Sequence, residues 1–256
     1  MPVPTYAYCT VAIGKSYLSS ALLFHTSVSD YPNHKRSVIT TDEKSLEGVD
    51  LDKVSPKIHF DIIESDYKVF NMPVGYYADQ FNYNVKHRPI LKSHQLCNDA
   101  DFIIFVDADW EVTHHYSESG VLSILEMMKT KSIDFLYERP HSIGAGKQPN
   151  ASGGCFWKHK IQAYGLMETD RYDAADVCNE QYMIFANNDK LSIFSANWMN
   201  LFNKSQVENI WSFAEGVEIG MSAVVADMKT SLIPHMVMND YYLFKARHTG
   251  DIYRKF

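Results

Sequence analysis

A short apolar run that ends in two acidic residues limits the fold more than any other part of the sequence. The run 101–106 (DFIIFV) carries five apolar residues in succession, which is typical of a strand buried on both faces of a parallel sheet. Asp107 and Asp109 follow it directly. Because ligands of open α/β sheets bind at the carboxyl ends of the strands, this acidic pair is predicted to lie in a ligand crevice.

Two carboxylates this close together repel each other unless a cation neutralises them. A hard divalent ion with oxygen ligands, Mg²⁺ or Mn²⁺, fits this requirement, and such ions commonly bridge to the oxygens of a diphosphate. The alternative is an ordinary acidic turn after a strand, because the pattern Asp-x-Asp also arises by chance. The two residues alone leave both interpretations open.

Strands and helices alternate along the first half of the chain. Strands are predicted over 6–13, 37–41, 58–63, 101–106 and from 135, and helices over 17–28, 89–97 and 121–128. This alternation with short links predicts an α/β fold with a mostly parallel central sheet flanked by helices.

The second half begins with a long polar segment. Residues 139–152 (RPHSIGAGKQPNAS) form a predicted loop of 14 residues, which is long enough to suggest a functional segment that orders over a ligand. Beyond it the sequence indicates a strand near 155–157, a helix ahead of Asn179 and then a polar, aromatic tail. We therefore expect a single domain over 1–256, with a nucleotide-binding half (1–112) and an acceptor- and sugar-binding half (113–256).

The composition excludes several classes of protein. The net charge of −7, from 24 basic and 31 acidic residues, argues against a chain that coats nucleic acid by charge alone. No apolar run reaches the roughly 18 residues that cross a bilayer, and Met1–Pro4 lacks the basic start of a secretion signal. The 4 cysteines are far apart and show no zinc pattern. A cytoplasmic location is therefore expected.

Five segments carry a resemblance to a known family, in the same order along the chain. They are 10–28 with Tyr17, Lys92 ahead of the Asp-x-Asp strand 101–112, Ser152-Gly153-Gly154, Asn179-Glu180-Gln181, and Arg247-His248-Thr249-Gly250. Together they resemble the retaining glycosyltransferases of the GT-A fold, most closely the glycogenin and bacterial lipopolysaccharide galactosyltransferase family (family eight). The resemblance implies a single Rossmann-like domain of that fold and a metal-dependent hexosyltransferase.

The resemblance also implies roles for individual residues. Asp107, Asp109 and His248 would hold Mn²⁺ or Mg²⁺ on the diphosphate of a nucleotide-sugar, for which a UDP-sugar is expected. Donor contacts would come from the ring of Tyr17 on the uracil, from Arg88, Lys92 and Lys255 at the phosphates, and from Ser152, Gly153 and Gly154 at the sugar. Taken alone, Tyr17 also fits a core position and His248 a structural histidine.

The segment 179–181 bears on how the stereochemistry is retained. Together with 135–139 it also resembles the blood-group type transferases (family six), in which a Glu at this place is the proposed nucleophile. Double displacement needs such a carboxylate, which Glu180 would supply. A front-side path needs only a group that stabilises the oxocarbenium-like centre, and Gln181 would serve. Both paths stay open.

Two departures from the family and several other functions bear on specificity. The segment 14–16 lacks the acidic residue that often precedes the stacking Tyr, and no Pro-Trp follows His248.

The expected acceptor is a glycan or a glycolipid at a membrane surface, and a modified base in viral DNA is the less favoured alternative. A sugar-nucleotide nucleotidyltransferase would open with a glycine-rich basic loop, whereas 10–16 has one Gly and one Lys. A non-catalytic module would bind the donor without turnover.

Overall fold

The computed structural model describes residues 2–63, 83–108, 110–112, 117–142, 176–207, 216–233 and 244–246. The strands are β1 (Tyr6–Val11), β2 (His34–Asp42), β3 (Ile58–Ile63), β4 (Phe102–Val106), β5 (Trp110–Val112), β6 (Phe135–Ser142), β7 (Asp176–Ala186), β8 (Thr230–Leu232) and β9 (Phe244–Ala246). The helices are α1 (Lys15–Val28), α2 (Glu43–Leu46), α3 (His87–Leu96), α4 (Glu118–Lys131), α7 (Asp189–Val207) and α8 (Gly216–Val225), with short 3₁₀ turns η1 (Leu51–Lys53) and η2 (Tyr83–Lys86).

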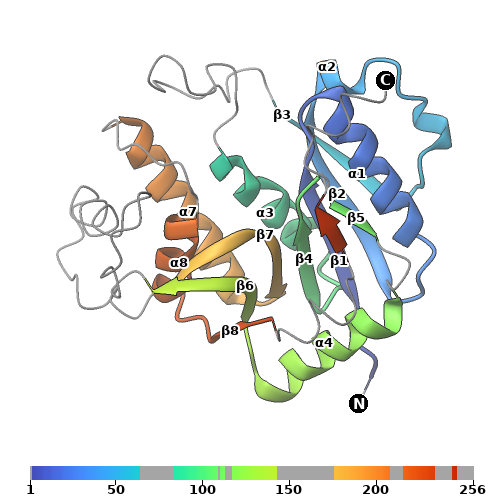
Figure 1. Cartoon of the computed structure of the whole chain (residues 1–256). Coiled ribbons are helices and arrows are strands. Elements are labelled where there is room, and N and C mark those ends of the chain that lie inside the picture. Colours follow the sequence, from blue (N-terminus) through green and yellow to red (C-terminus); the bar gives the residue numbers. More distant parts are fainter. Residues whose placement is uncertain are drawn as a thin grey trace.

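Seven of these strands form one sheet, in the order β3-β2-β1-β4-β7-β6-β8 (Figure 1). The pairs β1–β2, β2–β3, β1–β4 and β6–β8 are parallel, whereas β7 runs antiparallel to both β4 and β6. The predicted α/β fold with a mostly parallel central sheet flanked by helices is therefore confirmed. Strands from both predicted halves of the chain share this sheet.

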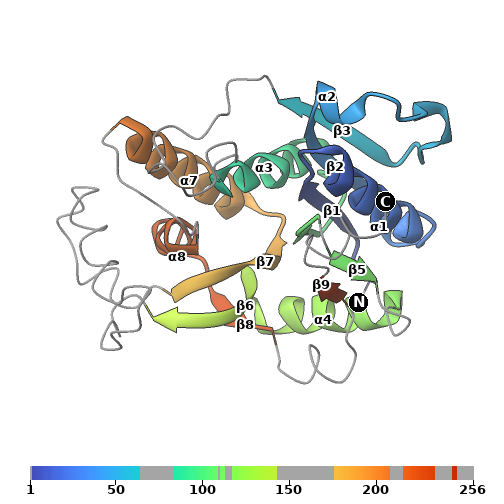
Figure 2. The same ribbon diagram turned by 45° about the horizontal axis from the view of Figure 1, so that its top comes forward.

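The two faces of the sheet are covered by different helices (Figure 2). Side chains alternate along a strand, so Phe102, Ile104 and Val106 pack with residues of α1 and α4, while Ile103 and Phe105 pack with residues of α3, α7 and α8. All five side chains of β4 are buried. Burial on both faces explains why this strand is apolar throughout.

The prediction of a polar, aromatic tail beyond Asn179 is wrong. Residues 176–186 form strand β7, and α7 and α8 follow it. The aromatic rings of this region lie in the core: Phe185 stacks on Phe135 with ring centroids 4.5 Å apart, and Trp198 meets Phe194 edge-on at 5.7 Å. Tertiary packing therefore decides the structure here, since the aromatic residues cover the α3 face of the sheet.

Local chemistry sets the ends of α4. The Ser117 hydroxyl accepts a hydrogen bond from the N–H of Gly120 at 3.3 Å, which satisfies one free donor of the first turn. The helix stops at Ser132, which adopts a left-handed conformation with φ of 52°.

Among the described helices, none is long and apolar enough to cross a membrane.

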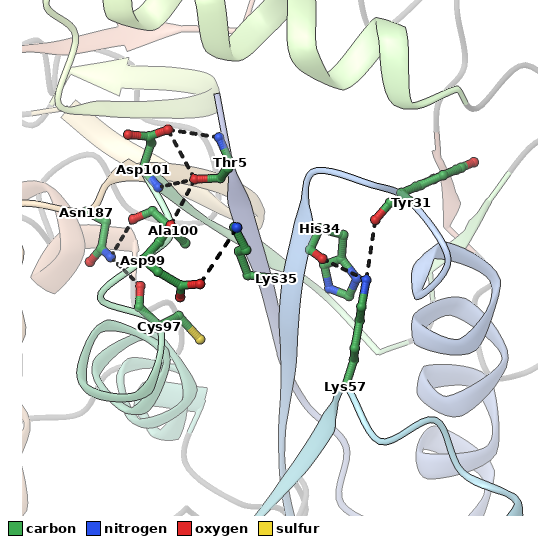
Figure 3. Close-up of polar contacts among 10 residues, drawn as sticks. All are labelled: Thr5, Tyr31, His34, Lys35, Lys57, Cys97, Asp99, Ala100, Asp101 and Asn187. Carbon is green, nitrogen blue, oxygen red and sulfur yellow. Dashed lines mark hydrogen bonds and ion pairs between the residues drawn. The ribbon is translucent and has the colours of Figure 1, made fainter. Parts of the chain in front are cut away.

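Polar contacts close the amino-terminal edge of the sheet (Figure 3). Asp101, just before β4, accepts hydrogen bonds from the backbone N–H and the hydroxyl of Thr5 at 2.9 and 3.1 Å. The Asn187 amide donates to the carbonyls of Cys97 and Ala100 at 2.9 and 2.8 Å. Lys57 donates to the His34 carbonyl at 2.9 Å. These groups use their hydrogen-bonding capacity on the backbone, so this edge has a structural role.

Two buried histidines share one hydroxyl between α1 and β2. The Ser37 oxygen lies 2.9 Å from Nδ1 of His25 and 3.2 Å from Nε2 of His34. A hydroxyl can donate to one ring nitrogen and accept from the other, so Ser37 can bridge two neutral imidazoles. Burial lowers the pKa of His25 to about 3 and that of His34 to about 4.

Candidate functional site

The strand order places the predicted ligand crevice between β1 and β4. The chain leaves β1 toward β2 on one side, whereas β4 pairs with β1 on the other side. This reversal is the topological switch point at which open α/β sheets bind ligands, beyond the carboxyl ends of the strands. The residues that follow β1 and β4 are therefore the candidates for a ligand site.

Gly14 shapes the end of the crevice that β1 provides. It precedes α1 with a φ of 99°, which side chains disfavour, and its N–H donates to the Ser45 hydroxyl at 2.7 Å. A Cβ at this position would lie 3.7 Å from the ring of Tyr17. Tyr17, the predicted base-stacking residue, is half-buried and packs against a cluster that includes Ala12 and Ala108, which directly follow β1 and β4 in the chain.

Gly14→Ala is expected to lower the free energy of unfolding by about 1–2 kcal/mol, because an L side chain is strained at positive φ. The measurement is urea denaturation followed by circular dichroism. Gly48→Ala is the matched control, since Gly48 has a φ of 86° and open space around its Cβ position. Similar losses in both variants indicate backbone strain, whereas an unchanged Gly14→Ala variant would contradict the assigned conformation.

Asp107 follows β4 and forms an ion pair with a lysine. The Nζ atom of Lys86, at the end of η2, lies 3.0 Å from Oδ1 and 3.3 Å from Oδ2 of Asp107. The side chain of Lys86 is 9% exposed and that of Asp107 is 20% exposed. The Lys86 ammonium also lies 5.7 Å from the centroid of the Phe105 ring. A carboxylate at the mouth of the crevice therefore has a cationic partner from a different element.

Strand β7 brings Gln181 next to Asp107. The Asp107 N–H donates to the Gln181 carbonyl at 2.9 Å, and Tyr182 pairs with Val106. On the other side of β7, the pairing with β6 jumps from Tyr137↔Met183 to Glu138↔Asn179. Residues 180–182 thus form a bulge relative to β6. Such irregularities are common beside active sites, where they redirect side chains.

Arg88 and Lys92 face the other side of α3, toward β3. Arg88 donates to both oxygens of Asp61 at 2.6 and 3.1 Å and to the Ile62 carbonyl at 3.0 Å. Lys92 follows one helical turn later on the same face, where its charge acts on His59. The structure therefore ties Arg88 to β3 and brings Lys86, rather than these two residues, to Asp107.

Several predicted site residues lie outside the described part of the chain. These are Asp109, His248, Ser152, Gly153, Gly154 and Lys255, and for Glu180 only the backbone within β7 is described. Strand β5, which follows Asp109, pairs antiparallel with β9, which precedes His248, through the pair Trp110↔Ala246. The chain segments next to two predicted metal ligands are therefore hydrogen-bonded to each other.

Among the described residues, Asp107 is the one predicted ligand of a hard divalent cation, and its chemistry fits that role. The Asp107 carboxylate lies at the ligand-binding edge and already has a positive partner, and carboxylates are preferred ligands of Mg²⁺ and Mn²⁺. In the described part of the chain, no three His, Cys, Asp or Glu side chains are grouped as a metal site. The other two predicted ligands, Asp109 and His248, lie outside the described residues.

Sequence reasoning missed Lys86. Lys92 lies in the predicted helix 89–97 and Arg88 just ahead of it, whereas α3 begins at His87 and Lys86 immediately precedes it. Pro89 lies in the first turn of α3 but is its third residue, so a helix whose first residue is Pro89 starts two positions too late. A helix that leads into β4 begins at the carboxyl edge of the sheet, so the residue just before it is the one nearest to the crevice.

Comparisons of the sequence found no match, whereas comparison of the structure with solved structures did. No protein-family model matches the chain, and no curated protein sequence matches it. Among solved structures, it is similar to the galactosyltransferase LgtC in complex with donor and acceptor sugar analogues, with 14% identity, a TM-score of 0.49, and coverage of 97% of this chain and 81% of that chain. This distant likeness concerns the fold, so the function proposed below rests on the chain's own residues.

Proposed function

We propose that the protein is a metal-dependent retaining glycosyltransferase of the GT-A fold that uses a nucleotide-sugar donor, namely a UDP-sugar. The observation that carries this proposal is the convergence of Asp107, Lys86 and Gln181 at the switch point of the sheet. A carboxylate, a cation and a strand bulge meet there, at the edge where α/β proteins bind nucleotides. The order of motifs along the sequence supports the same conclusion.

Asp107, Asp109 and His248 are the residues that would hold Mn²⁺ or Mg²⁺. When bound, such an ion supplies Lewis-acid stabilisation of the charge on a leaving nucleoside diphosphate. Asp107 contributes an anionic ligand at a fixed position, because its backbone N–H is bonded to β7. The paired strands β5 and β9 connect the segments that carry the other two ligands.

Lys86 has a role of its own in this proposal. Its buried ammonium balances the charge of Asp107. Because the donor phosphates would bind next to Asp107, the ammonium would also stabilise the negative charge that grows on the leaving group. Tyr17 stacks on the base at the start of α1. Arg88, Lys92, Lys255 and the backbone of Ser152, Gly153 and Gly154 remain predicted donor contacts.

Gln181 and Glu180 are the proposed catalytic residues. Gln181 is adjacent to Asp107 through the hydrogen bond from Asp107 N–H, so the bulge of β7 lies against the same crevice. If Glu180 is the nucleophile, the reaction proceeds by double displacement. If Gln181 only stabilises the oxocarbenium-like centre, it proceeds on the front side. The proposed acceptor is a glycan or a glycolipid at a membrane surface.

The test is thermal stability against nucleotide-sugars and free nucleotides, each with Mn²⁺ and with EDTA. A ligand that binds only the folded state stabilises it by about 2.7 kcal/mol at 100 times its Kd, so binding is readily seen. We expect a Mn²⁺-dependent increase in melting temperature with a UDP-sugar. An increase with a nucleoside triphosphate but no sugar donor indicates a nucleotidyltransferase, and no increase with any nucleotide contradicts the proposal.

A further inference from the structure

The start of α3 is attached to the sheet at two separate carboxylates. Lys86 immediately precedes the helix and Arg88 is its second residue. Residues two apart on a helix do not face each other, so these two side chains diverge. Lys86 binds Asp107, with Nζ 3.0 Å from Oδ1. Arg88 instead donates to both carboxylate oxygens of Asp61, at 2.6 and 3.1 Å.

The two carboxylates lie at the same level of the sheet. Asp61 in β3 is aligned with Thr40 in β2, and Thr40 is aligned with Val11 in β1. The register of β1 with β4, continued just beyond β4, brings Asp107 level with Val11. Three strand spacings, about 14 Å, separate β3 from β4. Helix α3 packs over the two strands between them, so two long side chains at its start can reach both carboxylates.

The ion pair between Arg88 and Asp61 is held in a fixed geometry. The Asp61 side chain is 8% exposed, and it also accepts a hydrogen bond from the Thr40 hydroxyl at 3.0 Å. Arg88 donates to the Ile62 carbonyl at 3.0 Å as well. A planar guanidinium that donates to a carboxylate at two points, and to a carbonyl beside it, has little freedom to turn.

The start of α3 needs such contacts because its own sequence weakens it. Lys86 occupies the N-cap position, and an ammonium has no acceptor for the free N–H groups of the first turn. The positive charges of Lys86 and Arg88 are also unfavourable at the positive end of the helix dipole. The carboxylates of Asp61 and Asp107 offset both effects.

We propose that Asp61 and Arg88 are positioning residues, whose ion pair fixes the start of α3 so that the Lys86 ammonium stays at Asp107. Neither residue has to touch the donor for this role, and Arg88 then acts through Lys86. Without the pair, the first turn of α3 is free to move, and Lys86 spends less time at Asp107. The effect on turnover rests on the proposed function, whereas the effect on Lys86 itself does not.

The first measurement follows the Lys86 ammonium by ¹H–¹⁵N NMR in the metal-free protein, with Lys86→Gln to assign its signal. A buried, ion-paired ammonium exchanges its hydrogens slowly, so the parent protein is expected to show this signal. Asp61→Asn removes the charge of the pair, and we expect the signal to be lost through faster exchange. Asp99→Asn breaks the exposed pair with Lys35 beyond the other end of α3, so this matched control should keep the signal.

The second measurement is Mn²⁺-dependent release of UDP from the donor. Because Lys86 acts on charge that grows after the donor has bound, Asp61→Asn is expected to lower kcat about tenfold and to leave KM within about twofold. Adding Asp61→Asn to Lys86→Gln should change kcat by less than about twofold, since the two residues act as one unit.

A second variant of the pair carries the test if Asp61→Asn does not fold. Arg88→Lys keeps the charge beside Asp61 but loses the two-point contact. We expect it to weaken the NMR signal of Lys86 and to lower kcat about threefold, between the parent protein and Asp61→Asn.

Three results overturn the positioning role. The parent protein shows no Lys86 signal, the signal is unchanged in the folded variants of Asp61 and Arg88, or the losses in Asp61→Asn and Lys86→Gln multiply in the double variant. A parent protein without turnover contradicts the proposed function instead, and the NMR result then decides the positioning role alone.

Discussion

Replacing Asp107 with Asn is expected to reduce Mn²⁺-dependent turnover of the donor by about a thousandfold or more. Metal ions contribute several kcal/mol of transition-state stabilisation, and each 1.36 kcal/mol corresponds to a factor of ten in rate. Asn has nearly the same shape and can still accept a hydrogen bond from Lys86, but it lacks the negative charge that a hard cation requires. The measurement is release of UDP from the sugar donor that gives the largest thermal stabilisation.

The matched control is the same substitution at the opposite end of β4. Asp101 binds Thr5 at the amino-terminal edge of the sheet, far from the crevice, so Asp101→Asn should retain turnover within about twofold of the parent protein. Equal losses in both variants would point to a folding defect. Full turnover with unchanged Mn²⁺ dependence in Asp107→Asn would remove Asp107 from the proposed metal site.

Acid is expected to destabilise the protein strongly between about pH 6.5 and pH 4. Both His25 and His34 have a lowered pKa in the folded state, to about 3 and about 4, whereas an unfolded histidine has a pKa near 6.5. Below pH 6.5 the unfolded chain binds protons that the folded chain excludes, so the free energy of unfolding falls as pH falls. At pH 5 the two residues together account for on the order of 4 kcal/mol.

Urea denaturation at pH 8, 7, 6 and 5 measures this loss. His25→Gln is expected to remove about half of the pH dependence, because one of the two excluded protons is no longer involved. Asp134 affects the free energy of unfolding in a separate pH range. Burial raises its pKa, but hydrogen bonds from Lys190 and the Lys229 N–H outweigh this effect and lower the pKa. The stability that Asp134 contributes is therefore lost below about pH 4. A free energy of unfolding that stays constant from pH 8 to pH 5 would contradict the neutral, buried pair.

The parts of the fold with strong local signals could be predicted from the sequence. The continuous apolar run over 102–106 is buried on both faces, and Asp107 follows it at the carboxyl end of the strand. The helix α1 and the strands β1 to β3 appear close to their predicted ranges. In each case, the pattern of apolar residues reflects which faces of the element are covered.

The second half could not be predicted in the same way. Strand β7 carries polar residues at its start, where it extends beyond the end of β4 and pairs with β6 alone, and this pairing depends on residues distant in sequence. The helices α7 and α8 are mixed in composition, yet Phe194 and Trp198 are fully buried. For the site, the ion pair of Asp107 with Lys86 depends on where α3 begins, and the predicted helix starts two residues later than α3 does.

The position of β7 has a consequence for synthesis of the protein. β4 gains its second hydrogen-bonded neighbour only when β7 is made, because Phe102 pairs with Ala186 and Val106 with Tyr182. Translation at about 5–20 residues per second leaves this apolar strand with an open edge for roughly 4–16 seconds. An unpaired apolar strand is a site for intermolecular pairing, so yield in cells should depend on chaperones and on translation speed between these two strands.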